Sequence, residues 1–169
     1  ETSSGERIRA RYVLSNASPN LVYGRMIDPP GALPEGAFKL VNARETGGSA
    51  FVVYLGLDRP PETLGIESYG YFIGPDMDTE KAYESFCSFG PPRMQAAVCL
   101  NRANPGCSPP GTTILSLTAL PGPDVWKEVK PEEYHKAKET IARAMIEQFC
   151  RAVGCSLWGH IEEVEIAAP

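Results

Sequence analysis

The chain has 169 residues, 43% of them hydrophobic and 22% charged, a composition typical of one globular domain. Its formal net charge is -5, and no run of like charge occurs, which argues against a nucleic-acid-binding surface and a polybasic membrane anchor. The strongest apolar run, residues 50–57, is far shorter than the roughly 20 residues of a membrane-spanning helix. We therefore expect a single domain over residues 1–169 that binds no nucleic acid.

Three patterns in the first part of the sequence predict short elements. The alternation of apolar and polar residues over Arg7–Leu14 predicts a half-buried strand. Ser18 is placed to cap a short helix whose first residue is Pro19. After a loop rich in proline and glycine, Phe38–Asn42 reads as another short strand.

The most prominent strand signal is the run Ala50–Leu57, whose β-branched, aliphatic and aromatic residues are typical of a central strand covered on both faces. Asp78 to Phe86 reads as a short helix that begins with a carboxylate cap. Four further strands are predicted between glycine and proline signals, at residues 68–73, 95–101, 112–120 and 161–166.

A long helix is predicted over Pro131–Val153, where apolar residues recur at three- and four-residue steps. Pro131 suits the first turn of a helix, and Gly154 is placed to end it in a left-handed conformation. The predicted fold class is therefore α+β, with a mixed, largely antiparallel sheet of about five or six strands and a long C-terminal helix packed on it.

Cysteine and histidine patterns give no catalytic or metal site. The five cysteines are odd in number and unevenly spaced, without a Cys-x-x-Cys pair, which argues against a disulfide framework and favours a reducing cytoplasm. The series Cys150, Cys155 and His160 does not have zinc-finger spacing and lacks an evident fourth ligand, so we expect no metal. No Gly-x-Ser-x-Gly elbow marks a hydrolase nucleophile.

A dinucleotide site needs Gly-x-Gly-x-x-Gly between a strand and a helix, and this sequence has none. We therefore expect these residues to bind no dinucleotide by themselves. A set of aromatic residues in and around two predicted strands, which includes Phe86 and Phe89, could line a hydrophobic cavity, although the residues alone favour an ordinary core for most of its members. The candidate lining residues are Phe51, Tyr54, Tyr69, Tyr71 and Phe72.

Three ordered blocks resemble the phytoene desaturase-like FAD-dependent oxidoreductases, which include carotenoid isomerases and retinol saturases. Residues 10–19, Ala-Arg-Tyr-Val-Leu-Ser-Asn-Ala-Ser-Pro, are similar to the family's run A-D-x-V-I-S-N-A-x-P, with Arg11 in place of the usual acid. Residues 49–58 are similar to S-A-F-x-x-Y-L-G-L-D. Residues 104–111 are similar to D-P-x-x-A-P-P-G, with Asn104 in place of Asp. Trp126 and the helix from Pro131 fall where the family has a tryptophan and a long helix.

The resemblance implies the substrate-side portion of a two-domain flavoprotein that moves a hydride between flavin and a hydrophobic, often polyene or isoprenoid, substrate. FAD would then be bound in the full-length protein by segments flanking these 169 residues. Asn16 and Ala17 would lie near the cofactor, at the domain junction. The resemblance assigns no catalytic residue, and it leaves open peripheral contact with a membrane, the substrate, the redox partner and the oligomeric state.

Two readings compete with the oxidoreductase. One is a stand-alone module that uses its aromatic strands to hold a lipid-like ligand or a protein and has no redox activity. The other is a structural domain that has lost an ancestral redox role. Alone, the fragment is expected to be inactive.

Overall fold

The structure is a computed structural model that describes residues 2–29, 32–34, 36–45 and 47–169. It contains two compact units, residues 1–46 and 47–169, and each is described here by itself. The prediction of one domain over residues 1–169 stays a prediction.

The described residues of the unit 1–46 form short helices and no strand. Helix α1 (Pro19–Leu21) continues into the π-helix η1 (Val22–Met26), and α2 (Ala37–Asn42) follows. The helix start at Pro19 is confirmed, but the Ser18 side chain makes no capping hydrogen bond. The strand predicted at 38–42 is wrong, because this segment is helix α2; a short apolar run fits either period.

The strand predicted over Arg7–Leu14 is also wrong. This segment has no regular structure, and Tyr12 and Leu14 on its predicted buried face are 86% and 101% exposed. A strand requires a hydrogen-bonded neighbour, and no strand pairing is formed by the described residues of this unit. Alternation alone therefore did not produce a sheet here.

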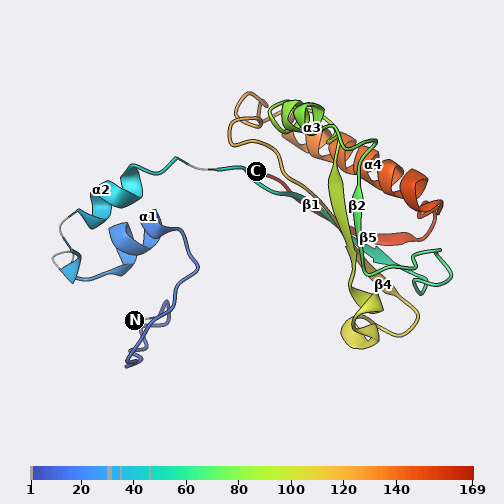
Figure 1. The fold of residues 1–169 in the computed structure, drawn as a ribbon. Helices are drawn as coiled ribbons and strands as arrows, with labels where there is room; N and C mark the ends of the chain where they lie inside the picture. Colours follow the sequence, from blue (N-terminus) through green and yellow to red (C-terminus); the bar gives the residue numbers. More distant parts are fainter. Residues whose placement is uncertain (1, 30–31, 35, 46) are drawn as a thin grey trace. The chain divides into compact units, whose positions relative to one another are not determined.

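Residues 47–169 form a five-stranded sheet with the order β2-β3-β4-β1-β5, in which every neighbouring pair is antiparallel (Figure 1). Its strands are β1 (Phe51–Leu57), β2 (Gly70–Ile73), β3 (Gln95–Cys99), β4 (Thr113–Ala119) and β5 (Ile161–Ala167). Each of the five strands lies within, or overlaps, one predicted strand segment. The α+β class, with its antiparallel sheet and C-terminal helix, is thus confirmed.

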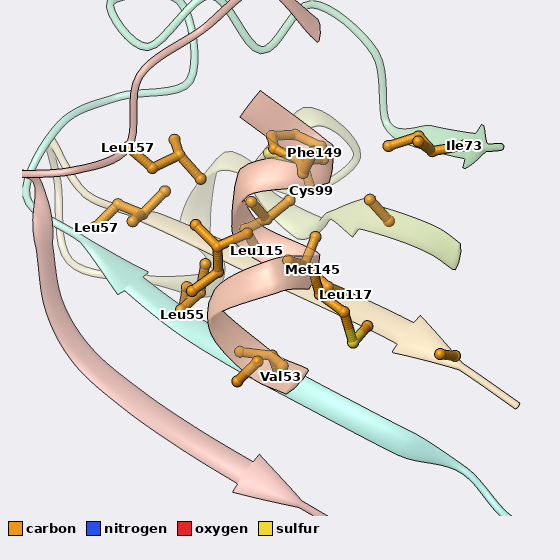
Figure 2. Close-up of a cluster of buried hydrophobic side chains, with 14 of the residues drawn as sticks. Val53, Leu55, Leu57, Ile73, Cys99, Leu115, Leu117, Met145, Phe149 and Leu157 are labelled. Carbon is orange, nitrogen blue, oxygen red and sulfur yellow. The ribbon is translucent and has the colours of Figure 1, made fainter. Parts of the chain in front are cut away.

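Helix α4 (Tyr134–Val153) lies along one face of this sheet (Figure 1). The hydrophobic core fills the space between them, and Figure 2 shows Met145 and Phe149 of α4 beside strand residues such as Leu115 and Leu117. Gly154 ends the helix at φ 75° and donates its N–H to the carbonyl of Cys150, which confirms the predicted stop. The helix begins three residues after Pro131, so the predicted place of this proline in the first turn is wrong.

Within residues 47–169, helices cover one face of the sheet. In β1, Phe51, Val53, Leu55 and Leu57 are buried, whereas Tyr54 between them is 45% exposed. The prediction that this strand is covered on both faces is therefore wrong: its apolar run reflects strong β propensity on the second face, where no helix of residues 47–169 packs.

Two short helical features complete this unit. Helix α3 (Thr79–Phe86) begins at the predicted Asp78 cap, whose carboxylate accepts a hydrogen bond from the Lys81 N–H at 3.1 Å. The 3-10 turns η3 (Leu100–Arg102) and η4 (Pro105–Cys107) lie between β3 and β4. None of the helices described in the chain combines the length and the apolar character needed to cross a membrane.

Candidate ligand-binding site

An apolar cavity of about 320 Å³ lies at one end of the sheet, where β1 and β3 begin and β4 ends. Its walls come from five parts of the chain: Phe51, Phe72, the segment from Ala82 to Ala96, the stretch from Thr118 to Trp126, and Ile141 of α4. Its volume falls at the lower end of the roughly 300–1,000 Å³ of small-molecule sites.

Trp126 is the centre of the aromatic wall. Its indole stacks on Phe51, with ring centroids 5.6 Å apart and planes 16° from parallel. Phe89 and Tyr134 meet the same indole edge-on, at 5.3 and 5.7 Å. Offset-stacked and edge-on arrangements are the favoured geometries of aromatic pairs, so these contacts fix the position of Trp126.

Phe86 forms another part of the wall and is held by two glycines. A Cβ added at Gly48 would lie 3.0 Å from the Phe86 ring. A Cβ at Gly122 would lie 3.0 Å from the Phe86 carbonyl oxygen, and the Gly122 N–H donates to that carbonyl at 2.8 Å. The close approach of both segments to Phe86 therefore depends on glycine at both positions.

Gln95, the first residue of β3, places one polar group in this apolar lining. Its side chain is buried, with 3% exposure, and its Nε2 donates to the Met145 carbonyl oxygen at 2.8 Å. Since a carbonyl only accepts, this bond fixes the orientation of the amide. No described residue donates a hydrogen bond to Gln95 Oε1.

Arg93 also lines the cavity, but its charge is already compensated. Its guanidinium forms an ion pair with Asp76, and its backbone N–H donates to Ser85 Oγ at 2.9 Å. Its carbonyl oxygen accepts from Gln148 Nε2 at 2.9 Å. Arg93 therefore closes one side of the cavity and separates it from a second, more polar groove that Gln148 lines.

The sheet face opposite α4, which we call the open face, is made of small, apolar and hydroxyl side chains with two acids at its β5 edge. Phe72 projects from it at 92% exposure and also lines the cavity. By strand register the open face comprises Val52, Tyr54, Gly56, Gly70, Phe72, Ala96, Val98, Ile114, Ser116, Thr118, Glu163, Glu165 and Ala167.

The five predicted lining residues do not surround one space. Phe51 and Phe72 both line the cavity, whereas Tyr54 lies on the open face. Tyr71 packs on the other side of the sheet, edge-on to Phe149 of α4 at 5.6 Å. Tyr69, which precedes β2, is half exposed. Their role as substrate-lining residues stays a prediction.

Asn16 and Ala17, predicted to lie near a cofactor, belong to the unit of residues 1–46. Asn16 is exposed, and Ala17 is half-buried with its N–H 3.3 Å from Ser15 Oγ. The predicted role of these residues also stays a prediction.

The block at residues 104–111 folds as a compact turn held by side chains. Asn104 Oδ1 accepts the Gly106 N–H at 3.1 Å, and the buried Asn101 links Ser108 to the Ile114 N–H, both at 2.7 Å. These bonds satisfy the polar groups of the turn internally. Within the chain this block is therefore a structural connection between β3 and β4.

The residues weighed as metal ligands make other contacts. His160 Nδ1 lies 2.9 Å from Asp58 Oδ1. Burial, and next the neighbouring Cys150 thiol, raises the pKa of Cys155 to about 11, which keeps this thiol protonated near neutral pH. In the part of the chain that the structure describes, no three His, Cys, Asp or Glu residues are grouped to hold a metal ion.

Sequence reasoning included Phe86 and Phe89 in the aromatic set, and both line the cavity, but it missed Gln95 and Trp126 as lining residues. Gln95 carries a usable signal, because it is a polar residue on the face that its strand neighbours Ala97 and Cys99 bury. Trp126 lies in a loop, where no periodicity assigns a side chain to the interior. Comparison with known proteins adds no further assignment: no protein-family model matches the chain, and no curated protein matches it.

Proposed function

We propose that this chain is the substrate-side portion of a FAD-dependent oxidoreductase acting on a hydrophobic, possibly polyene or isoprenoid, molecule by hydride transfer to or from the flavin. The resemblance of residues 10–19, 49–58 and 104–111 to the phytoene desaturase-like family supports the class of enzyme. The open face supports the proposed role of the chain, which is to bind the substrate of that enzyme. In this proposal the open face forms the wall against which the hydrophobic substrate lies.

The open face is the observation that carries the proposal. Phe72, exposed at 92%, projects from a face of small and apolar side chains, and contiguous exposed apolar surface marks sites that bind another molecule. Phe72 lies opposite Ala96, which in turn lies opposite Thr118, and all three also line the cavity, so the open face adjoins the cavity at the end of the sheet.

The starts of helices α3 and α4 in residues 47–169 do not fit the phosphates of FAD. A pyrophosphate needs free N–H groups at a helix N-terminus. At α3 the Asp78 carboxylate occupies that position, and α4 begins directly after Glu132 and Glu133. Carboxylates at both helix starts would repel phosphate, so the proposal assigns flavin binding to other segments of the enzyme and no redox step to the residues described here.

The test is made on the natural full-length protein. The purified protein should contain flavin, which absorbs blue light and makes the solution yellow. The flavin should be reduced or reoxidised when a polyene substrate is added. Phe72→Asp should slow this reaction while flavin content stays unchanged, because a charge on the open face opposes apolar contact. Met77→Asp is the matched control, since Met77 is 89% exposed and lies outside the open face. A colourless, flavin-free full-length protein would refute the proposal.

One observation favours the alternative of a stand-alone binding module: residues 47–169 form the whole cavity by themselves. Such a module would bind a hydrophobic molecule without flavin. The same full-length preparation separates the two functions, because a module would show ligand binding with no flavin and no change in absorbance.

A further inference from the structure

We propose that Cys150 and Cys155 form an oxidative modification site, at which a small disulfide such as oxidised glutathione converts the two thiols into a reversible disulfide bond. This bond would tie the end of α4 to the segment that leads to β5. All five cysteines of the chain are free thiols in the structure. The site lies at the end of α4 and needs no flavin, so the inference goes beyond the proposed redox function.

The backbone at the end of α4 brings the two cysteines together. The Cys150 carbonyl oxygen accepts the N–H of Gly154 at 2.9 Å and the N–H of Cys155 at 3.0 Å. Because an N–Cα bond spans about 1.5 Å and a carbonyl oxygen lies about 2.4 Å from its own Cα, the second hydrogen bond keeps the two cysteine Cα atoms within about 7 Å. Cysteines within about 7 Å can be bridged without backbone movement.

The side chains of the two cysteines are adjacent as well. Gly154 ends α4 at φ 75°, and this kind of helix ending commonly brings the residue after the glycine into side-chain contact with the last turn of the helix. Cys150 and Cys155 both pack against the same hydrophobic core. The neighbouring Cys150 thiol is also, after burial, the next cause of the raised pKa of Cys155. The two sulfur atoms therefore lie side by side.

The covalent step is a thiol–disulfide exchange. The thiolate of Cys150 attacks one sulfur of oxidised glutathione, so that a new S–S bond forms, the S–S bond of glutathione breaks, and one glutathione leaves as a thiolate. Cys155 then gives its proton to solvent, and its thiolate attacks the Cys150 sulfur and displaces the second glutathione. The protein thiols lose two electrons and two protons, which reduce one oxidised glutathione to two molecules of its thiol.

The surroundings of Cys155 determine the order of these steps. Because its pKa is raised to about 11, the Cys155 thiol is protonated near neutral pH, and Cys150 supplies the first thiolate. A Cys150 sulfur that carries glutathione holds no negative charge, so its contribution to the raised pKa of Cys155 is then removed. The second attack joins groups that are already in contact, and this proximity compensates for the small fraction of thiolate.

The test is made on the natural full-length protein under native conditions. The protein is incubated with oxidised glutathione at mildly alkaline pH, quenched with acid, unfolded, blocked with N-ethylmaleimide and digested with trypsin. Cleavage after Arg143 and Arg151 places the two cysteines in different peptides, one spanning residues 144–151 and one beginning at Ala152. A disulfide between Cys150 and Cys155 therefore links these peptides, and mass spectrometry detects the linked pair.

Two other cysteines serve as internal references. Cys87 is exposed, so it reports that the oxidant is effective, and the concentration of oxidised glutathione is raised until Cys87 carries glutathione. Cys99 is buried at 0% exposure and should stay a free thiol. Under these conditions we expect the linked pair to be the main form of the two peptides. Reduced dithiothreitol should separate the pair, and circular dichroism should be the same before and after.

Single substitutions test the second step. Cys155→Ser should leave glutathione on Cys150, because the attack that displaces it is no longer possible. Cys107→Ser is the matched control, since Cys107 is also half-buried but lies in η4, and this variant should form the linked pair as the wild type does.

Two outcomes would overturn the inference. One is the recovery of Cys150 and Cys155 as free thiols, or as separate glutathione adducts, while Cys87 is modified. The other is a linked pair that forms only after the protein has been unfolded in urea, because the folded end of α4 would then prevent the bond. Neither outcome bears on flavin content, so this inference and the proposed function fail separately.

Discussion

Phe51 and Trp126 stack with ring centroids 5.6 Å apart, and this pair joins the first residue of β1 to a loop 75 positions further along the chain. Phe51 is buried in the core at 2% exposure, whereas Trp126 is half-buried and lines the cavity. The pair therefore couples the stability of the sheet to the shape of the candidate site.

Replacing Trp126 by alanine should destabilise residues 47–169 by about 2–4 kcal/mol, because the substitution removes three aromatic contacts and enlarges the cavity. Urea unfolding followed by circular dichroism measures the loss. Trp158→Ala is the matched control: its indole is 45% exposed with Arg143 over the ring, and its loss should cost less than about 1 kcal/mol. Equal losses for both variants would contradict the central role of Trp126.

Gly122→Ala should lower stability by about 1–3 kcal/mol, because the added methyl group would lie 3.0 Å from the Phe86 carbonyl oxygen and 3.2 Å from the ring. Backbone at that distance cannot move aside as a flexible side chain can. Gly47→Ala is the control, since a Cβ there meets nothing within 4 Å and φ is ordinary, and it should be neutral or slightly stabilising. Thermal unfolding of both variants gives the comparison, and an unaffected Gly122→Ala protein would show that this contact is not tight.

The sheet and the long helix were predictable because each has a local signal. In β4, residues alternate between buried and half-buried from Thr113 to Ala119, and the α4 residues of the core recur at three- and four-residue steps. The failed strand at Arg7–Leu14 shows the limit of the same signal, because alternation describes one segment and a sheet needs two.

The cavity was not predictable in the same way. Its walls combine loop residues such as Phe89 and Trp126 with the ends of α3, β3 and β4, and only the tertiary fold brings these segments together. The aromatic residues Phe51 and Phe72 were singled out by composition, yet composition could not separate them from Tyr71, which packs in the core beside Phe149. Strand register decides which face of the sheet each side chain lies on, and the position along the strand decides whether it reaches the cavity.

Cys155 should react slowly with iodoacetamide in the folded chain. Its pKa of about 11, against an ordinary 9.0, leaves about a hundredfold less thiolate at pH 8. Mass spectrometry of each cysteine over a pH series should show a Cys155 rate that keeps rising toward pH 11. Cys150→Ser should raise the rate at pH 8 only in part, since burial is the larger cause of the shift. A rate that levels off near pH 9 would contradict the raised pKa.

Asp78 should make the stability of residues 47–169 depend on acid. The Lys81 ammonium, 3.0 Å from the carboxylate, and the Lys81 backbone N–H lower the pKa of Asp78 in the folded chain. The stabilisation is therefore fully present above the unfolded pKa of about 3.9 and is lost as the pH falls through the lower folded value. Asp78→Asn keeps a capping oxygen but cannot titrate.

The stability difference between the wild-type chain and Asp78→Asn, measured by urea unfolding, should accordingly favour the wild type above pH 4 and shrink below it. Glu80→Gln is the matched control, because Glu80 lies in the same first turn but is not the cap. Its difference from the wild type should depend less on pH over the same range. If the Asp78→Asn difference is constant with pH, the Lys81 contacts do not hold the carboxylate ionised, and the cap acts through its oxygen alone.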